Sequence, residues 1–203
     1  MYNANILETS ACIEYSLNAS IPFKKTYKTI KAYHNTKIST YVNNCNDKWH
    51  TDTIEKESYN VINRAANELV DVKLGRGKHG LVRKQVRDQS EKRLKDYFDN
   101  ISIKKLITSP DHNPIANFYQ DLYNTPEGRA KLIALQTRKK ATDYMPEPND
   151  LIIIAESIEL LKNESLCLIS GDGHFTDFKE EISNKFSLSV LDYYDVNILN
   201  SRS

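Results

Sequence analysis

Hydrophobic residues along this chain fall into two patterns, short continuous runs and spacings of three or four. Continuous runs lie at 5–7, 166–170 and 188–191, and each is followed by polar residues or glycine. Such runs indicate buried strands. Residues 37–42 are rich in β-branched and aromatic side chains and predict a further strand. Helical spacing fills most of the chain between these runs. Strands that alternate with helices in this way predict a parallel sheet with crossover helices.

The helical spacings, with their capping residues and prolines, predict the remaining elements. Helices are expected at residues 11–17, 26–33, 54–70, 81–98, 115–123, 127–140, 151–161 and 176–186. Candidate caps are Thr9 or Ser10 for the first of these helices, Thr53 for the third, and Asn149 or Asp150 for the seventh.

The middle of the chain, from about 58 to 143, is polar and helical, and no strand is expected within it. The polar residues 43–49 before it are expected to form a loop. We therefore expect residues 1–203 to form a single α/β domain. Its three layers, α/β/α, enclose a central parallel sheet, and the middle segment is an enlarged, mainly helical and basic insertion.

Length and composition exclude several classes of protein. A chain of 203 residues that is 39% hydrophobic can bury one large core. The net charge of only +1 argues against polyanion binding over the whole surface, and no apolar window approaches eighteen residues, so no membrane partner is expected. The first residues lack the features of a signal peptide. Cys12, Cys45 and Cys167 are odd in number and widely spaced, which is typical of buried thiols in a cytoplasmic protein.

Four acidic residues stand at comparable places, each after a predicted strand or early in a helix: Glu8, Glu57, Asp150 and Asp172. The carboxyl ends of parallel strands meet at one edge of a sheet, so these side chains can converge there. Carboxylates about 4 Å apart repel by roughly 4 kcal/mol per pair at an effective dielectric constant near 20, unless a cation neutralises them. Oxygen ligands select Mg²⁺ or Mn²⁺ over zinc, and such an ion suits phosphodiester hydrolysis.

Four segments resemble, in order, the motifs of PIN domains, a nuclease fold related to flap endonucleases and toxin ribonucleases. Residues 6–10 (Ile-Leu-Glu-Thr-Ser) resemble the opening strand followed by Asp-Thr-Ser, and residues 53–57 (Thr-Ile-Glu-Lys-Glu) a helix start with Thr-x-x-x-Glu. Residues 149–156 resemble an Asp before a helix rich in Ile and Ala, and residues 169–175 a strand that ends in x-Asp-x-Asp-Phe.

The resemblance covers residues 1–57 and 145–192 and leaves out the long middle. It implies a PIN-like fold and a metal-dependent endoribonuclease whose catalytic carboxylates belong to Glu8, Glu57, Asp150 and Asp172. Further residues are implied in supporting roles: Asp177 as a metal ligand beside Glu8, Asp150 and Asp172, Ser10 as a residue that orients the attacking water, and His174 as a neighbour of the ligands.

Two departures from the PIN pattern bear on activity. Glu8 stands where the family has Asp, and its longer side chain moves the oxygens outward by about one bond. His174 takes the place of the second Asp in the last motif, and Asp177, one turn further on, is a substitute for it.

Each candidate also has a purely structural explanation. Asp150 can cap a helix, and Asp172 can serve as a turn residue between two glycines. Glu57 can be a solvated helix residue, and Glu55 competes with it for the catalytic role. His174 can be an ordinary surface histidine.

The middle segment carries a local excess of basic residues, which continues at 129–140. The residues proposed to contact phosphates are Arg76, Lys78, Arg83, Lys84 and Arg87. A solvated helix face with internal ion pairs explains the same pattern. The glycine-rich residues 75–80 lack the strand and the Lys-Ser/Thr pair of a phosphate loop, so an NTPase is rejected.

The leading prediction is therefore a ribonuclease that cuts internal phosphodiester bonds with Mg²⁺ or Mn²⁺. RNA is the expected partner; DNA, a homodimer, and an inhibitor protein if the chain is a toxin stay open. The alternative is a catalytically degenerate PIN-like module that binds nucleic acid or a protein without cutting, which Glu8 favours.

Overall fold

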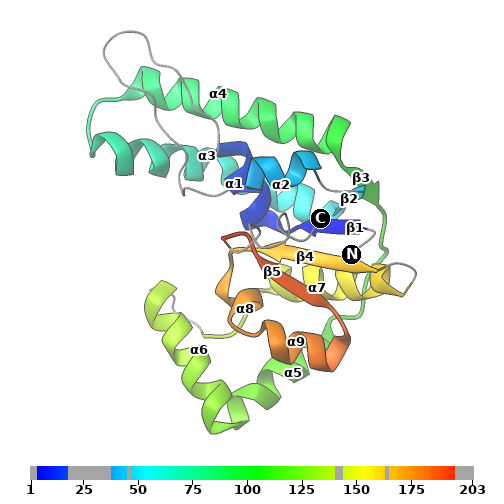
Figure 1. The fold of residues 1–203 in the computed structure, drawn as a ribbon. Helices are drawn as coiled ribbons and strands as arrows, with labels where there is room; N and C mark the ends of the chain where they lie inside the picture. Colours follow the sequence, from blue (N-terminus) through cyan, green and yellow to red (C-terminus); the bar gives the residue numbers. More distant parts are fainter. Residues whose placement is uncertain (1–3, 18–37, 45–46, 140–143, 163–164, 195–203) are drawn as a thin grey trace.

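The computed structural model describes residues 4–17, 38–44, 47–139, 144–162 and 165–194, and its centre is a sheet of five parallel strands (Figure 1). The strands lie in the order β3-β2-β1-β4-β5, with bounds β1 Ala4–Leu7, β2 Asp47–Thr51, β3 Ile103–Lys105, β4 Leu166–Ser170 and β5 Ser189–Asp192. The chain builds one half of the sheet outward from β1 and then returns to place β4 on the other side of β1.

Helices cover both faces of the sheet, which confirms the predicted three-layer α/β/α fold (Figure 1). One face carries α1 (Thr9–Leu17), α2 (Ile38–Asn44), α3 (Asp52–Leu74) and α4 (Gly80–Asp96). The other carries α5 (Asn113–Asn124), α6 (Pro126–Lys139), α7 (Pro148–Leu161), α8 (Gly173–Thr176) and α9 (Lys179–Phe186). Right-handed crossovers that run in opposite directions from β1 produce this division.

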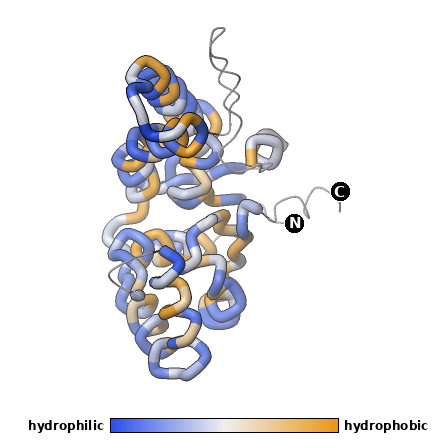
Figure 2. Tube along the Cα trace, turned by 90° about the vertical axis from the view of Figure 1, so that its left-hand side faces the viewer, coloured by the Kyte–Doolittle hydropathy of each residue, from blue (hydrophilic) through white to orange (hydrophobic). Residues whose placement is uncertain are grey.

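The predicted strands at 5–7, 166–170 and 188–191 are confirmed as β1, β4 and β5. Every residue of β1 and β4 is buried, which explains their continuous apolar runs. The helices instead show hydrophobic and hydrophilic positions side by side along their length (Figure 2). They bury one stripe and expose the other, as their spacing predicts.

Residues 38–44 form helix α2, so the strand predicted at 37–42 is wrong. Ile38, Tyr41 and Val42 are buried and follow the i, i+3, i+4 spacing of a helix face. The β-branched content of the segment favoured a strand, but packing against α1 stabilises a helix instead. The helix predicted at 26–33 lies outside the described residues.

Strand β2 includes part of the polar loop predicted at 43–49, so that prediction is also wrong. The buried polar side chains of β2 have partners: Nδ1 of His50 lies 2.8 Å from Oγ of Ser102, and Oγ1 of Thr51 donates to Glu156 over 2.6 Å. Because paired polar groups tolerate burial, β2 lacks the continuous hydrophobic run of β1 and β4.

The middle segment contributes a strand, β3, although none was predicted between 58 and 143. This edge strand has three residues, two of them exposed, so it has no apolar pattern to detect. The chain reaches it through a π-helical turn, Tyr97–Ile101, that follows α4 directly. The insertion therefore belongs partly to the sheet.

Several helix ends differ from the predictions. Helix α1 begins at Thr9, so Thr9 and Ser10 lie within its first turn, and Thr51 rather than Thr53 caps α3. The helix predicted at 176–186 is divided into α8 and α9.

Two further expectations concern cysteines and membranes. Cys12 and Cys167 are buried, as expected, and Cys45 lies outside the described residues. Within the described part of the chain, no helix is both long and apolar enough to span a bilayer.

Candidate functional site

A cavity of about 380 Å³ opens at the carboxyl edge of the sheet, where β1 and β4 end side by side. The strand order reverses here, because β2 and β3 lie beyond β1 while β5 lies beyond β4. Open α/β sheets form binding sites at such reversals, since the loops that leave the two strands run in opposite directions. Residues of α1 and α3 line one side of the cavity, and residues from the ends of α6 and α7 and from α8 line the other.

Carboxylates dominate the lining of this cavity. Seven of the described lining residues are acidic: Glu8, Glu14, Glu57, Glu68, Glu147, Asp150 and Asp172. All four predicted catalytic acids are among them. Of the described lining residues, only Lys139 carries a permanent positive charge. The cavity is therefore electronegative and favours cations.

Glu8 is buried at the end of β1 and is held by serine hydroxyls. Its Oε2 accepts hydrogen bonds from the backbone N–H of Ser10 at 3.0 Å, from Oγ of Ser10 at 2.5 Å and from Oγ of Ser170 at 2.8 Å. Its Oε1 receives no hydrogen bond from any described residue. Burial, reinforced by the negative charges of Asp172 and Asp150, raises the pKa of Glu8 to about 8 despite the hydrogen bonds from Ser10.

Ser10 and Ser170 connect the ends of β1 and β4. Oγ of Ser10 accepts from the N–H of Gly171 at 2.8 Å, while Oγ of Ser170 accepts from the N–H of Asp172 at 2.9 Å. Each hydroxyl donates to Glu8 and accepts from the loop after β4, so the two strand ends are held in a fixed relation. Ser10, predicted to orient water, here orients the Glu8 carboxylate.

Asp172 is the N-cap of helix α8 and forms an ion pair with Lys139 at the end of α6. Its two oxygens lie 2.7 and 2.6 Å from Nζ of Lys139, and Oδ1 accepts from the N–H of His174 at 2.8 Å. Burial alone would raise the pKa of Asp172. The hydrogen bonds from His174 and the charge of Lys139 outweigh burial and hold that pKa well below its ordinary value.

His174 brings Asp150 and Asp172 together. Its Nδ1 lies 3.6 Å from Oδ2 of Asp150 and 3.4 Å from Oδ1 of Asp172, so both carboxylates lie close to one imidazole nitrogen. Burial would lower the pKa of His174, but the two acids outweigh it and raise that pKa to about 9. The N-cap of α7 is Glu147 rather than Asn149 or Asp150. Asp150, at N3, accepts from the backbone N–H of Glu147 at 3.0 Å in a capping box and also lines the cavity.

Of the two competing glutamates, Glu57 faces the cavity and Glu55 does not. Oγ1 of Thr9 donates to Glu57 over 2.6 Å, and burial raises the pKa of Glu57. Glu55 instead pairs with Lys104 at 2.8 Å, beside Asp52 at 2.9 Å. The structure therefore places Glu57, and not Glu55, at the cavity.

Asp177 does not line the cavity with the other predicted metal ligands. Its Oδ2 lies 2.6 Å from a guanidinium nitrogen of Arg138, in an ion pair that joins the last turn of α6 to the end of α8. The structure therefore gathers Glu8, Asp150 and Asp172 but leaves Asp177 outside the group.

Sequence reasoning missed two residues that hold the acids in place, Lys139 and Glu156. Lys139 was expected only within the basic stretch 129–140, and nothing in a helix end points to an ion pair across the fold. Glu156 accepts from Thr51 and from Oγ1 of Thr53, the latter at 2.8 Å, and so ties α7 to the start of α3. It fixes the helices that carry Asp150 and Glu57.

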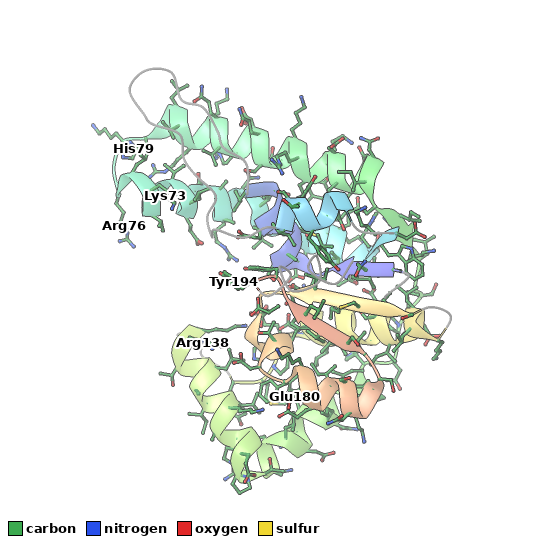
Figure 3. All side chains as sticks on the ribbon, viewed as in Figure 1. Lys73, Arg76, His79, Arg138, Glu180 and Tyr194 are labelled. Carbon is green, nitrogen blue, oxygen red and sulfur yellow. The ribbon has the colours of Figure 1, made fainter. Side chains whose placement is uncertain are left out.

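The predicted phosphate contacts lie mostly at the far end of the α3–α4 hairpin. Figure 3 shows Arg76 and Lys73 at this free end, on the side of the molecule where Arg138 of α6 also lies. Helix α3 continues for seventeen residues beyond Glu57, to Leu74, which is roughly 26 Å at 1.5 Å per residue, and Arg76 follows that end of the helix.

Exposure and ion pairing divide these basic residues into two groups. Arg83 forms an ion pair with Asp71 across the hairpin, as the structural explanation of the charged pattern predicted. The other four basic residues form no ion pair with a described residue, and Arg76, Lys78 and Lys84 are exposed while Arg87 is partly buried.

The acids are not arranged as a finished metal site. Among the described residues, no three His, Cys, Asp or Glu side chains form a group that could hold a metal ion as they stand. Oε2 of Glu8 accepts hydrogen bonds from serine hydroxyls, and both oxygens of Asp172 pair with Lys139. A cation at this place would have to compete with Lys139.

Comparison with known proteins adds no assignment. The chain matches no model of a known protein family and no curated protein sequence. Function is therefore inferred from the chemistry of the cavity.

Proposed function

We propose that this protein is a divalent-metal-dependent ribonuclease that cuts internal phosphodiester bonds at the acidic cavity. The observation that carries the proposal is the convergence of Glu8, Glu57, Asp150 and Asp172, from four separate elements, on one cavity at the strand-order reversal. Each of these acids comes from a segment that resembles a PIN motif, which supports a PIN-like nuclease.

The acids supply the oxygen ligands that Mg²⁺ or Mn²⁺ prefers. Glu8, Asp150 and Asp172 would hold it, with Glu57 beside them. Burial and the neighbouring acids raise the pKa of Glu8, so a cation beside this carboxyl group would favour its ionised form. When bound, the ion would supply the positive charge that stabilises the transition state of phosphodiester hydrolysis.

The chain's own residues would orient the acids and hold the substrate. Ser10 and Ser170 fix the Glu8 carboxyl group, and Thr9 fixes that of Glu57. RNA is a polyanion that the acidic lining repels, so binding needs positive charge nearby. Lys139 supplies positive charge at the cavity. The exposed basic residues of the α3–α4 hairpin supply it further along the bound RNA.

A second candidate function has an observation of its own. The cavity already holds an ammonium group, because Nζ of Lys139 sits between the oxygens of Asp172. A degenerate module that captures a basic side chain of a partner protein would use the same acids without cutting RNA.

Cleavage of labelled single-stranded RNA, with single-stranded DNA in parallel, distinguishes the two functions. The nuclease proposal expects cleavage with Mg²⁺ or Mn²⁺, none with EDTA, and loss of cleavage in Asp172→Asn. Asp177→Asn is the matched control, since it removes an acid from α8's other end, outside the cavity. No cleavage by wild type under any metal would reject the nuclease and leave the binding module.

A further inference from the structure

Helix α3 carries one continuous stripe of residues that leads from the cavity toward the free end of the α3–α4 hairpin. Glu57, Val61, Ala65 and Glu68 line the cavity, at the spacing of three and four that keeps residues on one face of a helix. Val72 is the next position on this face, and it is 66% exposed. The face that begins at the acids therefore continues beyond the cavity, along the surface of α3.

The stripe beyond Glu57 is mainly apolar. Val61, Ala65 and Val72 are uncharged, and they offer aliphatic contacts for the apolar faces of a ribose or a base. Glu68 is the one acid on this part of the stripe, and its carboxylate lies 4.0 Å from Nε of Arg64, whose positive charge offsets it. The stripe therefore repels a polyanion less than the cavity does.

At the end of the stripe the charge of the chain changes sign. Residues 72–87 contain no acidic residue and six basic ones: Lys73, Arg76, Lys78, Arg83, Lys84 and Arg87. Of these, Arg76, Lys78 and Lys84 are exposed and form no ion pair with a described residue. Figure 3 shows Lys73 and Arg76 at the free end of the hairpin. Charge complementarity favours an anionic ligand at this end, whereas the cavity favours cations.

We propose that a single RNA strand lies along this stripe, with one phosphodiester bond at the acidic cavity and phosphates further along the strand bound by the hairpin end. This inference rests on the proposed function and adds the direction in which the strand leaves the cavity and the length of substrate that the protein needs. From Glu57 to the end of α3 at Leu74 is roughly 26 Å at 1.5 Å per residue. A stacked strand advances about 3.4 Å per nucleotide, so roughly eight nucleotides span this distance.

A series of single-stranded oligoribonucleotides, from about three to about twelve nucleotides long, tests this path. Their binding to Asp172→Asn is measured by fluorescence anisotropy, so that the RNA is not cut. Affinity is expected to rise with length and to level off near about eight nucleotides, where the strand reaches the hairpin end. Adding Arg76→Gln and Lys78→Gln together should weaken binding of the longest RNA by about tenfold and leave binding of the shortest unchanged.

A second substitution tests the stripe itself, and two variants serve as controls. Val72→Glu places a negative charge on the path and should weaken binding of the longer RNAs only. Leu106→Glu is the matched control, because Leu106 is also exposed, at 78%, but follows β3 at the edge of the sheet. Lys95→Gln removes a lysine at the other end of α4 that pairs with Asp99, and it should leave binding unchanged at every length.

Three results would overturn the path. The first is equal weakening of short and long RNAs by the hairpin substitutions, and the second is a Val72→Glu variant that binds as well as Leu106→Glu. The third is metal-dependent cleavage of the shortest RNA at the rate of the longest, which would leave the nuclease intact. Length-dependent binding without cleavage by wild type under any metal would support the path and reject the nuclease.

Discussion

Glu8 and Asp172 lie at the ends of adjacent strands and line one cavity, yet their acidities are shifted in opposite directions. Burial raises the pKa of Glu8 to about 8, and its hydrogen bonds come from serine hydroxyls and an amide. Asp172 is also buried in part, but His174 and Lys139 lower its pKa. The presence of a cation, rather than burial, separates the two carboxyl groups.

Among the described lining residues, the positive charges lie on one side of the cavity. The side formed by β4, α6 and α8 carries its own cations, while the side formed by β1 and α1 does not. A divalent ion would therefore gain most beside Glu8. Pairs of acids with opposite shifts are typical of catalytic sites, although ion-pair networks without catalytic function show them as well.

The largest expected effect is on stability at the Glu8 side. The folded-state pKa of Glu8 lies above its ordinary value of 4.5, so the folded protein binds more protons than the unfolded chain between pH 4.5 and about 8. Stability should fall through that window by up to about 1.4 kcal/mol per pH unit. Urea unfolding in EDTA at pH 5 and 8 measures it, and Glu8→Gln should remove this component. The same pH dependence in both proteins would show that Glu8 is not the titrating group.

Asp172 should behave in the opposite way. Its lowered pKa stabilises the fold at neutral pH, and this contribution is lost as the pH falls below the ordinary value of 3.8. Asp172→Asn should cost about 1.5–3 kcal/mol of unfolding free energy at pH 7 without metal, the usual range for a hydrogen bond to a charged group. Chemical denaturation at pH 7 and pH 3 tests this prediction. A variant as stable as wild type at pH 7 would mean that the Lys139 pair adds nothing.

Glu57 and Glu55 offer a matched pair of substitutions on one helix. Glu57→Gln should lower metal-dependent cleavage by about 10- to 100-fold, as expected for a group that supports a metal site. Glu55→Gln should leave cleavage near the wild-type rate, because Glu55 pairs with Lys104 outside the cavity. Initial rates at saturating Mg²⁺ provide the comparison, and equal losses in both variants would remove Glu57 from the site.

The smallest expected effect concerns the basic hairpin. Replacing Arg76 or Lys84 by Gln should reduce the slope of log affinity against log salt by about 0.7–0.9 for each phosphate that the protein no longer neutralises. Arg83→Gln is the control, since Arg83 is paired with Asp71. The slopes come from RNA binding measured at several salt concentrations. Each substitution is made in Asp172→Asn, so that the RNA is not cut. If only the Arg83 variant changes the slope, the exposed residues do not bind phosphates.

Continuous apolar runs predicted β1 and β4, whereas β2, whose burial is partly polar, was missed. β1 and β4 carry continuous hydrophobic runs, whereas His50 and Thr51 of β2 are buried through hydrogen bonds that no local pattern reveals. The four acids could be grouped because strand ends share an edge. The ion pair between Lys139 and Asp172 could not be predicted. The two residues are 33 positions apart, and they meet only because α6 packs close to α8.

Mn²⁺ titration of three proteins tests the central claim, that the gathered carboxylates hold a divalent cation, most directly. Wild type and Asp177→Asn should bind Mn²⁺ with equal affinity, since Asp177 is paired with Arg138 away from the cavity. Asp172→Asn should bind at least about tenfold more weakly, because one ligand charge is removed. Binding that is absent in wild type, or unchanged in Asp172→Asn, would contradict the claim.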